Sequence, residues 1–251
     1  MNRPARLQRL AEVLEEGQSL RLRDAATLLE VSEMTVRRDL ASSGGSLRYL
    51  GGHILKLAAA GRDRYVLDDE RSSHTAGKIA ASTRAATFVR EDDAIFVDCG
   101  TTLPHFVQRL PESMRLTVVC YSLEIASILS ARPSVRLILL GGLYHPSSAS
   151  FASDEALDQL RKVGINKAFL SAAGVHPERG TSCMHFHEVA VKQAAIAGAV
   201  ERYLVVDSSK FGQVKPAFFA ACDDFDAIVT DADVDARYRE SALGQRLLVA
   251  S

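Results

Sequence analysis

The sequence lacks any uninterrupted apolar run approaching the roughly 18–20 residues needed to cross a bilayer. Arg3, Arg6 and Arg9 interrupt the apolar pattern near the N-terminus, so we expect no signal peptide. Cysteine is scarce, with no Cys-x-x-Cys or Cys-x-x-His pairing, which favours free buried thiols in a reducing compartment. The four cysteines are Cys99, Cys120, Cys183 and Cys222. We therefore expect a soluble, cytoplasmic protein.

A strong charge of either sign is also missing. The formal net charge is −1, from 30 Lys and Arg against 31 Asp and Glu. Residues 1–56 carry nine basic and seven acidic side chains, so even this part has a net charge of only +2. Charge alone therefore identifies no function. A nucleic-acid-binding protein with so little positive charge would need several subunits and a defined target site to bind tightly. The 251 residues suffice for one large or two smaller domains.

Residues 23–40 have the pattern of two helices joined by a tight turn. The first helix has an apolar face formed by Ala25, Ala26, Leu28 and Leu29. Val31 fills the turn, and Ser32 is a suitable N-cap for a second helix over 33–42. In that helix Val36 and Leu40 face inward. Its outer and flanking faces carry Met34, Thr35, Arg37 and Arg38.

Adjacent arginines on a short polar helix suit the major groove of DNA. A guanidinium group bonds guanine O6 and N7 as a fork or clamps a phosphate, and Thr35 is able to contact a thymine methyl group or a phosphate. The alternative is an exposed helix of a helical bundle whose charges are simply solvated.

The flanking sequence favours the DNA-binding interpretation. Residues 3–16 predict an amphipathic helix whose apolar side is formed by Leu7, Leu10, Val13 and Leu14. Residues 44–57 predict two short strands around Gly51-Gly52, a dipeptide that tolerates the positive φ angles of a hairpin turn. Three helices followed by a hairpin form a winged helix-turn-helix. The hairpin of this fold reaches the DNA backbone or minor groove, and it carries Arg48, His53 and Lys56.

The segment VSEMTVRRDL, followed by a Gly-Gly wing, resembles the N-terminal domain of DeoR-family bacterial transcription regulators. The family usually has His-Gly-Gly in its basic wing, whereas this chain has Leu50-Gly51-Gly52 and then His53. The DNA-binding residues expected on both grounds are Ser32, Met34, Thr35, Arg37, Arg38, Arg48 and His53. We expect residues 1–57 to form this domain and double-stranded operator DNA to be its partner.

The rest of the chain has a different pattern. Residues 58–77 are charged, lack periodicity and predict a linker. Over 78–251, short apolar strands alternate with helices, which predicts an α/β domain with a mostly parallel sheet covered on both faces. The expected strands are 94–98, 116–120, 135–140, 167–171, 203–207 and 227–230. The expected helices are 78–89, 102–110, 123–131, 154–162 and 188–201.

Ligands of open parallel sheets bind outside the carboxyl ends of the strands. The sequence DCGTT after the first of these strands suits a phosphate, because it combines a glycine, two hydroxyl groups and a helix N-terminus. The alternatives are an ordinary strand-to-helix turn there and a surface ion pair between Glu188 and Lys192. The expected effector-binding residues are Asp98, Gly100, Thr101, Thr102, Ser122, Gly141, Gly142, Gly174, Glu188, Lys192 and Lys210.

The strings FVDCGTT, VCYSL, SAAGVH and VVDSSKFGQVKPA resemble the effector domain of DeoR-family regulators, which is related to ribose-5-phosphate isomerase and glucosamine-phosphate deaminase folds. Within the family they are most similar to regulators of deoxyribonucleoside catabolism. This resemblance implies a repressor released by a sugar phosphate, deoxyribose 5-phosphate. We also expect homo-oligomerisation through the α/β domain, since one weakly charged winged domain is too weak to select an operator.

Two other functions have to be weighed. The first is a sugar-phosphate isomerase, but the loop that supplies catalytic aspartates in the related isomerases reads SAAG at 171–174, and alanine abstracts no proton. We therefore expect no enzyme activity. The second is a metal site formed by Cys183, His185, His187 and Glu188, whose clustering within six residues is weak evidence for a metal. We expect no metal or cofactor and give His74 and His105 no functional role.

Overall fold

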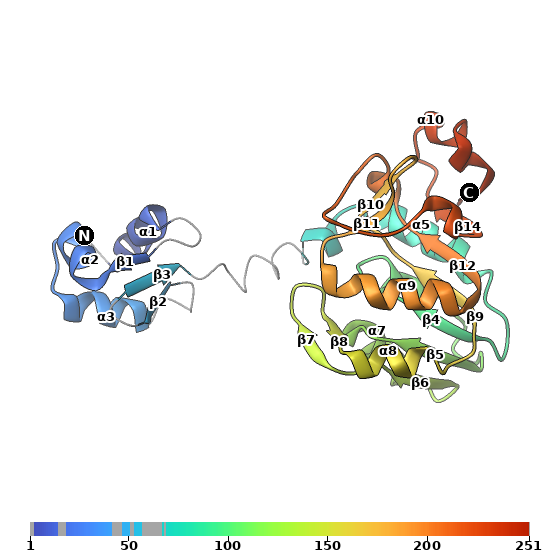
Figure 1. Ribbon diagram of the computed structural model, residues 1–251, viewed down its shortest axis with the longest axis horizontal. Helices are drawn as coiled ribbons and strands as arrows, with labels where there is room; N and C mark the ends of the chain where they lie inside the picture. The colour runs from blue at the N-terminus through green and yellow to red at the C-terminus, as the bar shows by residue number, and fades with distance from the viewer. Residues whose placement is uncertain are drawn as a thin grey trace. The chain divides into compact units, whose positions relative to one another are not determined.

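The computed structural model describes residues 3–14, 19–41, 47–50, 53–56, 67 and 69–250. The chain divides into two compact units, Met1–Val66 (unit 1) and Leu67–Ser251 (unit 2), which are described separately (Figure 1). In the part of the chain that is described, no helix is both long and apolar enough to span a membrane. The four cysteines are free and buried, as expected.

Unit 1 has the predicted order of three helices and a hairpin. Its elements are α1 (Arg3–Val13), β1 (Ser19–Arg21), α2 (Leu22–Leu29), α3 (Glu33–Ala41), β2 (Leu47–Leu50) and β3 (His53–Lys56). The strand β1, which the sequence did not predict, pairs antiparallel with β3 and completes a sheet of order β1-β3-β2. This is the arrangement of a winged helix-turn-helix domain.

The core of unit 1 differs from the prediction at two positions. Leu28 is 40% exposed and Val13 is 39% exposed, although both were expected to face inward. In α2 the inner face is taken by Leu22, Ala25, Ala26 and Leu29. Because successive helical residues are about 100° apart, Leu28 lies off that face. The predicted inward positions Val36 and Leu40 of α3 are buried.

Unit 2 is built on a seven-stranded, entirely parallel sheet, which confirms the predicted α/β architecture. The order of its strands is β15-β14-β12-β9-β4-β5-β6. The strands are β4 (Ala94–Val97), β5 (Leu116–Cys120), β6 (Val135–Leu139), β9 (Ile165–Leu170), β12 (Ala199–Val205), β14 (Ala227–Thr230) and β15 (Leu247–Val249). Only β15, three residues long, was not predicted from the sequence.

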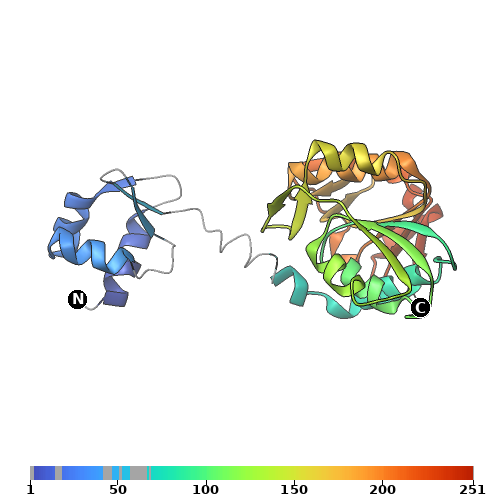
Figure 2. The same ribbon diagram turned by 90° about the horizontal axis from the view of Figure 1, so that it is seen from below.

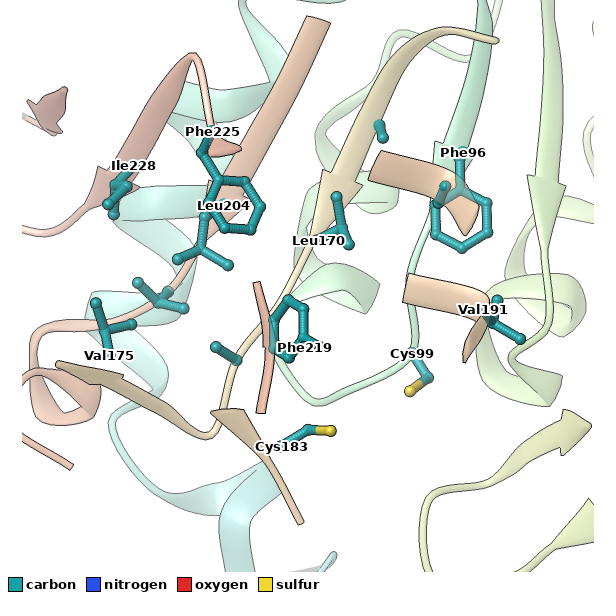
Figure 3. Close-up of a cluster of buried hydrophobic side chains, with 14 of the residues drawn as sticks. Phe96, Cys99, Leu170, Val175, Cys183, Val191, Leu204, Phe219, Phe225 and Ile228 are labelled. Carbon is teal, nitrogen blue, oxygen red and sulfur yellow. The ribbon is translucent and has the colours of Figure 1, made fainter. Parts of the chain in front are cut away.

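Helices cover both faces of this sheet (Figure 2). One face packs against α5 (Thr75–Ala86), α6 (Leu103–Arg109) and α7 (Leu123–Leu129). The other face packs against α8 (Asp154–Leu160) and α9 (Val189–Gly198), and Figure 3 shows part of its core. Side chains alternate between the two cores, as pleated strands require: Ile95 and Val97 enter the first, and Phe96 enters the second. Helix α5 begins at Thr75, inside the range expected for the linker.

Several short elements extend the loops at the carboxyl ends of the strands. They include the hairpin β7 (Leu143–His145) and β8 (Ser150–Ala152), and a small sheet of β10 (Gly174–His176), β11 (Gly180–Cys183) and β13 (Ala217–Ala220). The short helices are η1 (Phe186–Glu188), η2 (Ser208–Lys210), η3 (Cys222–Asp224), α10 (Ala236–Arg239) and η4 (Ala242–Gln245). Each has three or four residues, too few to produce a periodic sequence signal.

Candidate functional site

The helix α3 presents the residues expected to contact DNA. Ser32 caps it, because its Oγ accepts a hydrogen bond from the backbone N–H of Thr35 at 3.2 Å. The Thr35 hydroxyl lies 2.9 Å from the same oxygen. Met34 is 67% exposed, and Arg37 and Arg38 are exposed as well. These side chains therefore form an outward, mostly polar surface opposite the buried face of α3, with the apolar Met34 exposed on it.

A partly buried ion pair fixes α3 to the first helix of unit 1. The Arg6 guanidinium group donates to both carboxylate oxygens of Asp39, at 2.7 and 3.1 Å, and Asp39 is buried. Such a fork fixes distance and orientation together. Asp39 was not among the predicted functional residues, since its partner is 33 positions away and no local pattern connects them.

The wing has the predicted register. Leu50 faces His53 across β2 and β3, so only two positions of the sequence separate the paired ends of the strands. Arg48 lies on β2 and His53 on β3. The side chains of these two residues, like Gly51 and Gly52 themselves, lie outside the described part of the structure, and their contacts with DNA stay predictions.

In unit 2, polar residues follow five adjacent strands of the sheet within one or two positions. Because all seven strands are parallel, their carboxyl ends lie at the same edge, where ligands of such sheets bind. The residues at this edge, taken from β14 to β5, are Asp231, Asp207, Ser171, Asp98, Tyr121 and Ser122. Asp207, Asp231, Ser171 and Tyr121 were not among the predicted site residues, although Ser171 and Asp207 end predicted strands and Tyr121 and Asp231 directly follow two others.

Asp98 is the centre of a fully buried polar network. Its Oδ1 accepts hydrogen bonds from the Tyr121 hydroxyl at 2.5 Å and from the Cys99 N–H at 2.9 Å. Its Oδ2 accepts from the Ser171 N–H at 2.8 Å and contacts the Lys192 ammonium group. Asp98 was expected to bind a sugar hydroxyl directly. With no exposed surface and both oxygens in use, it instead holds the loops after β4, β5 and β9 together.

Lys192 and Glu188 lie one turn apart on α9 and η1, as predicted. Lys192 Nζ also donates to the backbone carbonyl of Ser171 at 3.1 Å, and it lies 3.6 Å from Glu188. Burial alone would lower the pKa of Lys192, but the carboxylates, above all Asp98, outweigh it and raise the pKa. Burial raises the pKa of Glu188, and the nearby lysine offsets only part of this effect. The pair is therefore buried and is not an exposed surface ion pair.

The glycine and threonines after β4 form a tightly packed turn. Gly100 has a φ of +104°, and a Cβ atom there would lie 2.6 Å from Ser171 Oγ, so only glycine fits. Thr101 is half-buried, whereas Thr102 is buried and its side chain makes no capping hydrogen bond to α6. After the neighbouring strand, Ser122 is buried and caps α7 by accepting from the Ile125 N–H at 3.4 Å.

The remaining predicted glycines lie farther along the loops. Gly141 and Gly142 are exposed and lead from β6 into the β7–β8 hairpin. Gly142 has a φ of +135°, and a Cβ atom there would lie 2.4 Å from the carbonyl oxygen of Ala152. Gly174 begins β10 in the smaller sheet, not the turn directly after β9. The effector-binding roles of these glycines stay predictions.

Three histidines, His145, His185 and His187, form a stack of rings. His185 and His187 were weighed as metal ligands. The ring centroids of His145 and His187 lie 3.7 Å apart with an interplanar angle of 11°, and the His185 ring stacks on His187 at 5.3 Å. Ser148 Oγ lies 3.0 Å from His187 Nε2. Burial and the two neighbouring histidines lower the pKa of His187 to about 4. Within the described ranges no group of three His, Cys, Asp or Glu residues has a geometry suited to a metal ion.

A second cluster, separate from Asp98 and Lys192 in its contacts, surrounds Lys210. Lys210 Nζ lies 2.7 Å from Glu70 Oε2, and the Lys78 ammonium group, which is buried, donates to the backbone carbonyl of Glu70. Burial alone would raise the pKa of Glu70. The hydrogen bond from Lys210 and the charges of Lys210, Lys78 and Lys215 outweigh this effect, so the pKa of Glu70 is lowered. Three lysines therefore act on Glu70 beside the end of β12, and Asp207 is a second carboxylate that acts on Lys78. Lys78 and Lys215 were not predicted.

Asp207 lies within the electrostatic reach of this lysine cluster. Its Oδ1 accepts hydrogen bonds from Ser209, but its buried Oδ2 has no hydrogen-bond donor among the described residues. A buried acceptor of this kind is available to accept a hydrogen bond from a hydroxyl group of a ligand. A separate hollow of about 470 Å³, lined by Arg179, Gln193 and Phe218 among others, contains none of the predicted effector-binding residues.

Comparisons with known proteins agree with this two-part organisation. Residues 6–54 match the model of the DeoR-like helix-turn-helix domain, and residues 73–232 match that of the DeoR C-terminal sensor domain. The deoxyribose operon repressor of Escherichia coli K12 is 38% identical over 245 residues, covering 98% of this chain and 97% of the relative. The uncharacterized regulator FruR of Bacillus subtilis is 31% identical over 235 residues, covering 92% of each chain.

Among solved structures, ribose 5-phosphate isomerase A from Neisseria gonorrhoeae is similar with a TM-score of 0.38 and 16% identity, over 55% of this chain and 53% of the isomerase. The family assignment depends on the two domain matches and on the sequence relatives, several of which are named as repressors. The chain therefore belongs to the DeoR family of helix-turn-helix transcriptional repressors and is a relative of the deoxyribose operon repressor.

Proposed function

We propose that this protein represses genes of deoxyribonucleoside catabolism and leaves its operator when deoxyribose 5-phosphate binds to unit 2. The identity of the genes is supported by a relative, 38% identical, that is named a deoxyribose operon repressor. The phosphorylated nature of the effector is supported by the lysine cluster at the carboxyl edge of the parallel sheet. That cluster is the observation on which the proposal depends.

The DNA-binding half of the proposal assigns base contacts to α3. Arg37 and Arg38 are exposed beside the half-buried Thr35 on a helix that is capped and fixed by an ion pair, so their positions are well defined. Either arginine reads a guanine or holds a phosphate. Arg48 and His53 of the wing contribute contacts to the DNA backbone or minor groove.

The effector half assigns the phosphate to Lys210 and Lys78 at the end of β12. Phosphate carries close to two negative charges, and two ammonium groups offset them where water is largely excluded. Thr101 lies on the turn after β4, and we assign its hydroxyl to a further phosphate contact. Sugar hydroxyl groups then bond to acceptors with spare capacity, Glu188 and the orphan oxygen of Asp207. Asp98 has a supporting role, since it positions these loops.

We propose sensing without catalysis. A sugar-phosphate isomerase requires a carboxylate base beside the carbon that loses a proton. The loop from Ser171 to Gly174 carries no carboxylate, and Asp98 is occupied by Lys192 and Tyr121. The relatives' names describe regulators, which agrees with this proposal.

We also propose that the protein acts as a homo-oligomer joined through unit 2. The weakly basic N-terminal unit has low affinity for DNA by itself, whereas two linked units bind neighbouring half-sites with a high effective concentration. Sedimentation equilibrium of the full chain tests this proposal. A dimer or larger species is expected at working concentrations, and a monomer that binds operator one-to-one contradicts it.

Calorimetric titration with deoxyribose 5-phosphate and with unphosphorylated deoxyribose tests the effector assignment. The wild type should bind the phosphorylated sugar far more tightly. The Lys210→Ala variant should fold and bind operator, yet lose this preference, because the cation beside the phosphate is gone. Lys162→Ala is the matched control, since Lys162 is exposed just before the amino end of β9, at the opposite edge of the sheet. Equal affinity for the two sugars, or an unchanged preference of Lys210→Ala for the phosphorylated sugar, contradicts the assignment.

A further inference from the structure

The first residues of unit 2 lie against two of the strand-end loops. Glu70 pairs with Lys210, which follows β12, and Arg71 pairs with Glu124, which follows β5, at 2.8 Å. In the sheet order, β9 and β4 lie between β12 and β5. Residues 70–71, which we call the strap, therefore connect to both sides of the strand ends that carry Ser171 and Asp98. The strap follows the end of unit 1, at Val66, by only a few residues.

Glu70 occupies the position that an anion would take in the lysine cluster. Its carboxylate accepts from Lys210, whose side chain is only 13% exposed, while the Glu70 side chain itself is 48% exposed. Its backbone carbonyl accepts from Lys78. The Lys210 side chain is thus largely buried, and the Glu70 side chain lies partly in solvent. An incoming anion would meet Glu70 before it met the lysines.

Two carboxylates, Glu70 and Asp207, face the three lysines of this cluster. Burial and the charge of Lys210 both lower the pKa of Lys78, although Asp207 and Glu70 act in the opposite direction. Lys215 adds a third ammonium group within reach of Glu70. Asp207 keeps its negative charge while its Oδ1 accepts hydrogen bonds from Ser209. With Asp207 in place, a group with nearly two negative charges compensates the three lysines better than the single charge of Glu70 does.

We propose that Glu70 is an internal competitor for the effector's phosphate group: its carboxylate fills the anion subsite of Lys210, Lys78 and Lys215 until a phosphate displaces it. The proposal deepens the proposed function and relies on it for the identity of the ligand. The displaced Glu70 frees the strap from the end of β12. Because the strap continues the chain that leaves the DNA-binding unit, occupation of the subsite changes how that chain is held. The effector would therefore bind more tightly to the state in which Glu70 is displaced than to the state in which Glu70 pairs with Lys210. Any allosteric coupling requires such a difference in affinity between two states.

Glu70→Gln tests the competition, because it removes the charge and keeps the size of the side chain. The full-length variant and the wild type are titrated with inorganic phosphate, at ionic strength held constant with chloride, by calorimetry. Removing an internal competitor raises apparent affinity, since a larger fraction of the protein is ready to bind. The expected gain is about fivefold, the upper range for a partly exposed ion pair. The gain should also appear with deoxyribose 5-phosphate and not with deoxyribose.

Glu91→Gln is the matched control. Glu91 is similarly exposed, at 45%, and pairs with Arg115 at 3.1 Å just before the amino end of β4, at the opposite edge of the sheet. It should bind phosphate as the wild type does. An affinity of Glu70→Gln equal to or below that of the wild type, or no phosphate binding by either protein, overturns the proposal.

Hydrogen exchange of the wild type gives a second readout that needs no variant. The Ser73 amide donates to the carbonyl of Asp69 at 2.9 Å, and it should exchange faster when phosphate is added. Unchanged or slower exchange overturns the proposal. If no sugar phosphate binds but phosphate still binds Glu70→Gln more tightly, the proposed function fails and the competition stands. If deoxyribose 5-phosphate binds both proteins equally, the competition fails and the proposed function stands.

Discussion

The Lys192 ammonium group contacts the Asp98 carboxylate, although 94 residues of chain separate the two positions. Both side chains are buried, and the contact joins α9 to the turn that follows β4. Tyr121 and Ser171 satisfy the remaining capacity of the carboxylate. The pair therefore connects three neighbouring strand ends and α9 in a single arrangement.

Replacement of Lys192 should be strongly destabilising. Lys192→Met leaves Asp98 buried without its cation, and breaking such a pair costs about 3–5 kcal/mol of unfolding free energy. Urea denaturation of the wild type and the variant measures this loss. The control Lys162→Met, at an exposed position, should change stability by no more than about 0.5 kcal/mol. The double variant Asp98→Asn/Lys192→Met should recover part of the loss. A Lys192→Met protein within about 1 kcal/mol of the wild type contradicts the role assigned to the pair.

The histidine stack predicts a specific dependence of stability on pH. The pKa of His187 falls from an ordinary 6.5 to about 4 in the folded protein, because burial and its two histidine neighbours oppose a positive charge. The neutral ring therefore contributes stability that is fully present above pH 6.5 and is lost as the pH falls toward 4. In thermal melts, the stability of the wild type relative to His187→Asn should decrease over this window.

The exposed His74 provides the control for the histidine prediction. His74→Asn makes the same chemical change outside the stack, at a backbone position with a φ of +48°, which asparagine tolerates. Its stability relative to the wild type should not follow the His187 profile. A difference between wild type and His187→Asn that is constant from pH 7.5 to 4 would show that His187 titrates normally.

Operator binding should depend on the arginines of α3. Replacing Arg37 or Arg38 by Ala should weaken binding by about 1–3 kcal/mol if that arginine reads a base, and more uniformly across DNA sequences if it holds a phosphate. Fluorescence anisotropy with labelled operator at fixed salt measures the change. Arg136→Ala, which removes an exposed arginine from β6 of unit 2, should bind as the wild type does. Wild-type affinity in the double variant Arg37→Ala/Arg38→Ala excludes α3 as the recognition helix.

Much of the fold follows from local sequence patterns. The cap at Ser32, the buried positions Val36 and Leu40 and the hairpin around residues 51 and 52 were predicted because each depends on residues close together in the chain. Six of the seven strands of the large sheet were predicted for the same reason, since a buried strand reads as a short apolar run. The three-residue strands β1 and β15 carry too little sequence to be recognised.

The candidate site was predictable only in part. Strand-end positions such as Asp98 and Lys210 could be listed, because a parallel sheet brings its carboxyl ends together. Their partners could not: Glu70 lies 140 residues before Lys210, in a segment expected to be a linker. Burial could not be predicted either, so Asp98 was expected to face a ligand, whereas the structure surrounds it with Tyr121, Ser171 and Lys192. Contacts distant in sequence are set by packing, which no local pattern encodes.

Release of operator DNA by a phosphorylated sugar tests the central claim most directly. A preformed complex of the full-length protein with labelled operator is titrated with deoxyribose 5-phosphate, and in parallel with deoxyribose, while anisotropy is recorded at constant ionic strength. We predict that the phosphorylated sugar lowers operator affinity by roughly 5- to 150-fold, the usual range of allosteric coupling, and that deoxyribose leaves it unchanged. Operator affinity that is unaffected by deoxyribose 5-phosphate, or lowered equally by both sugars, would contradict it.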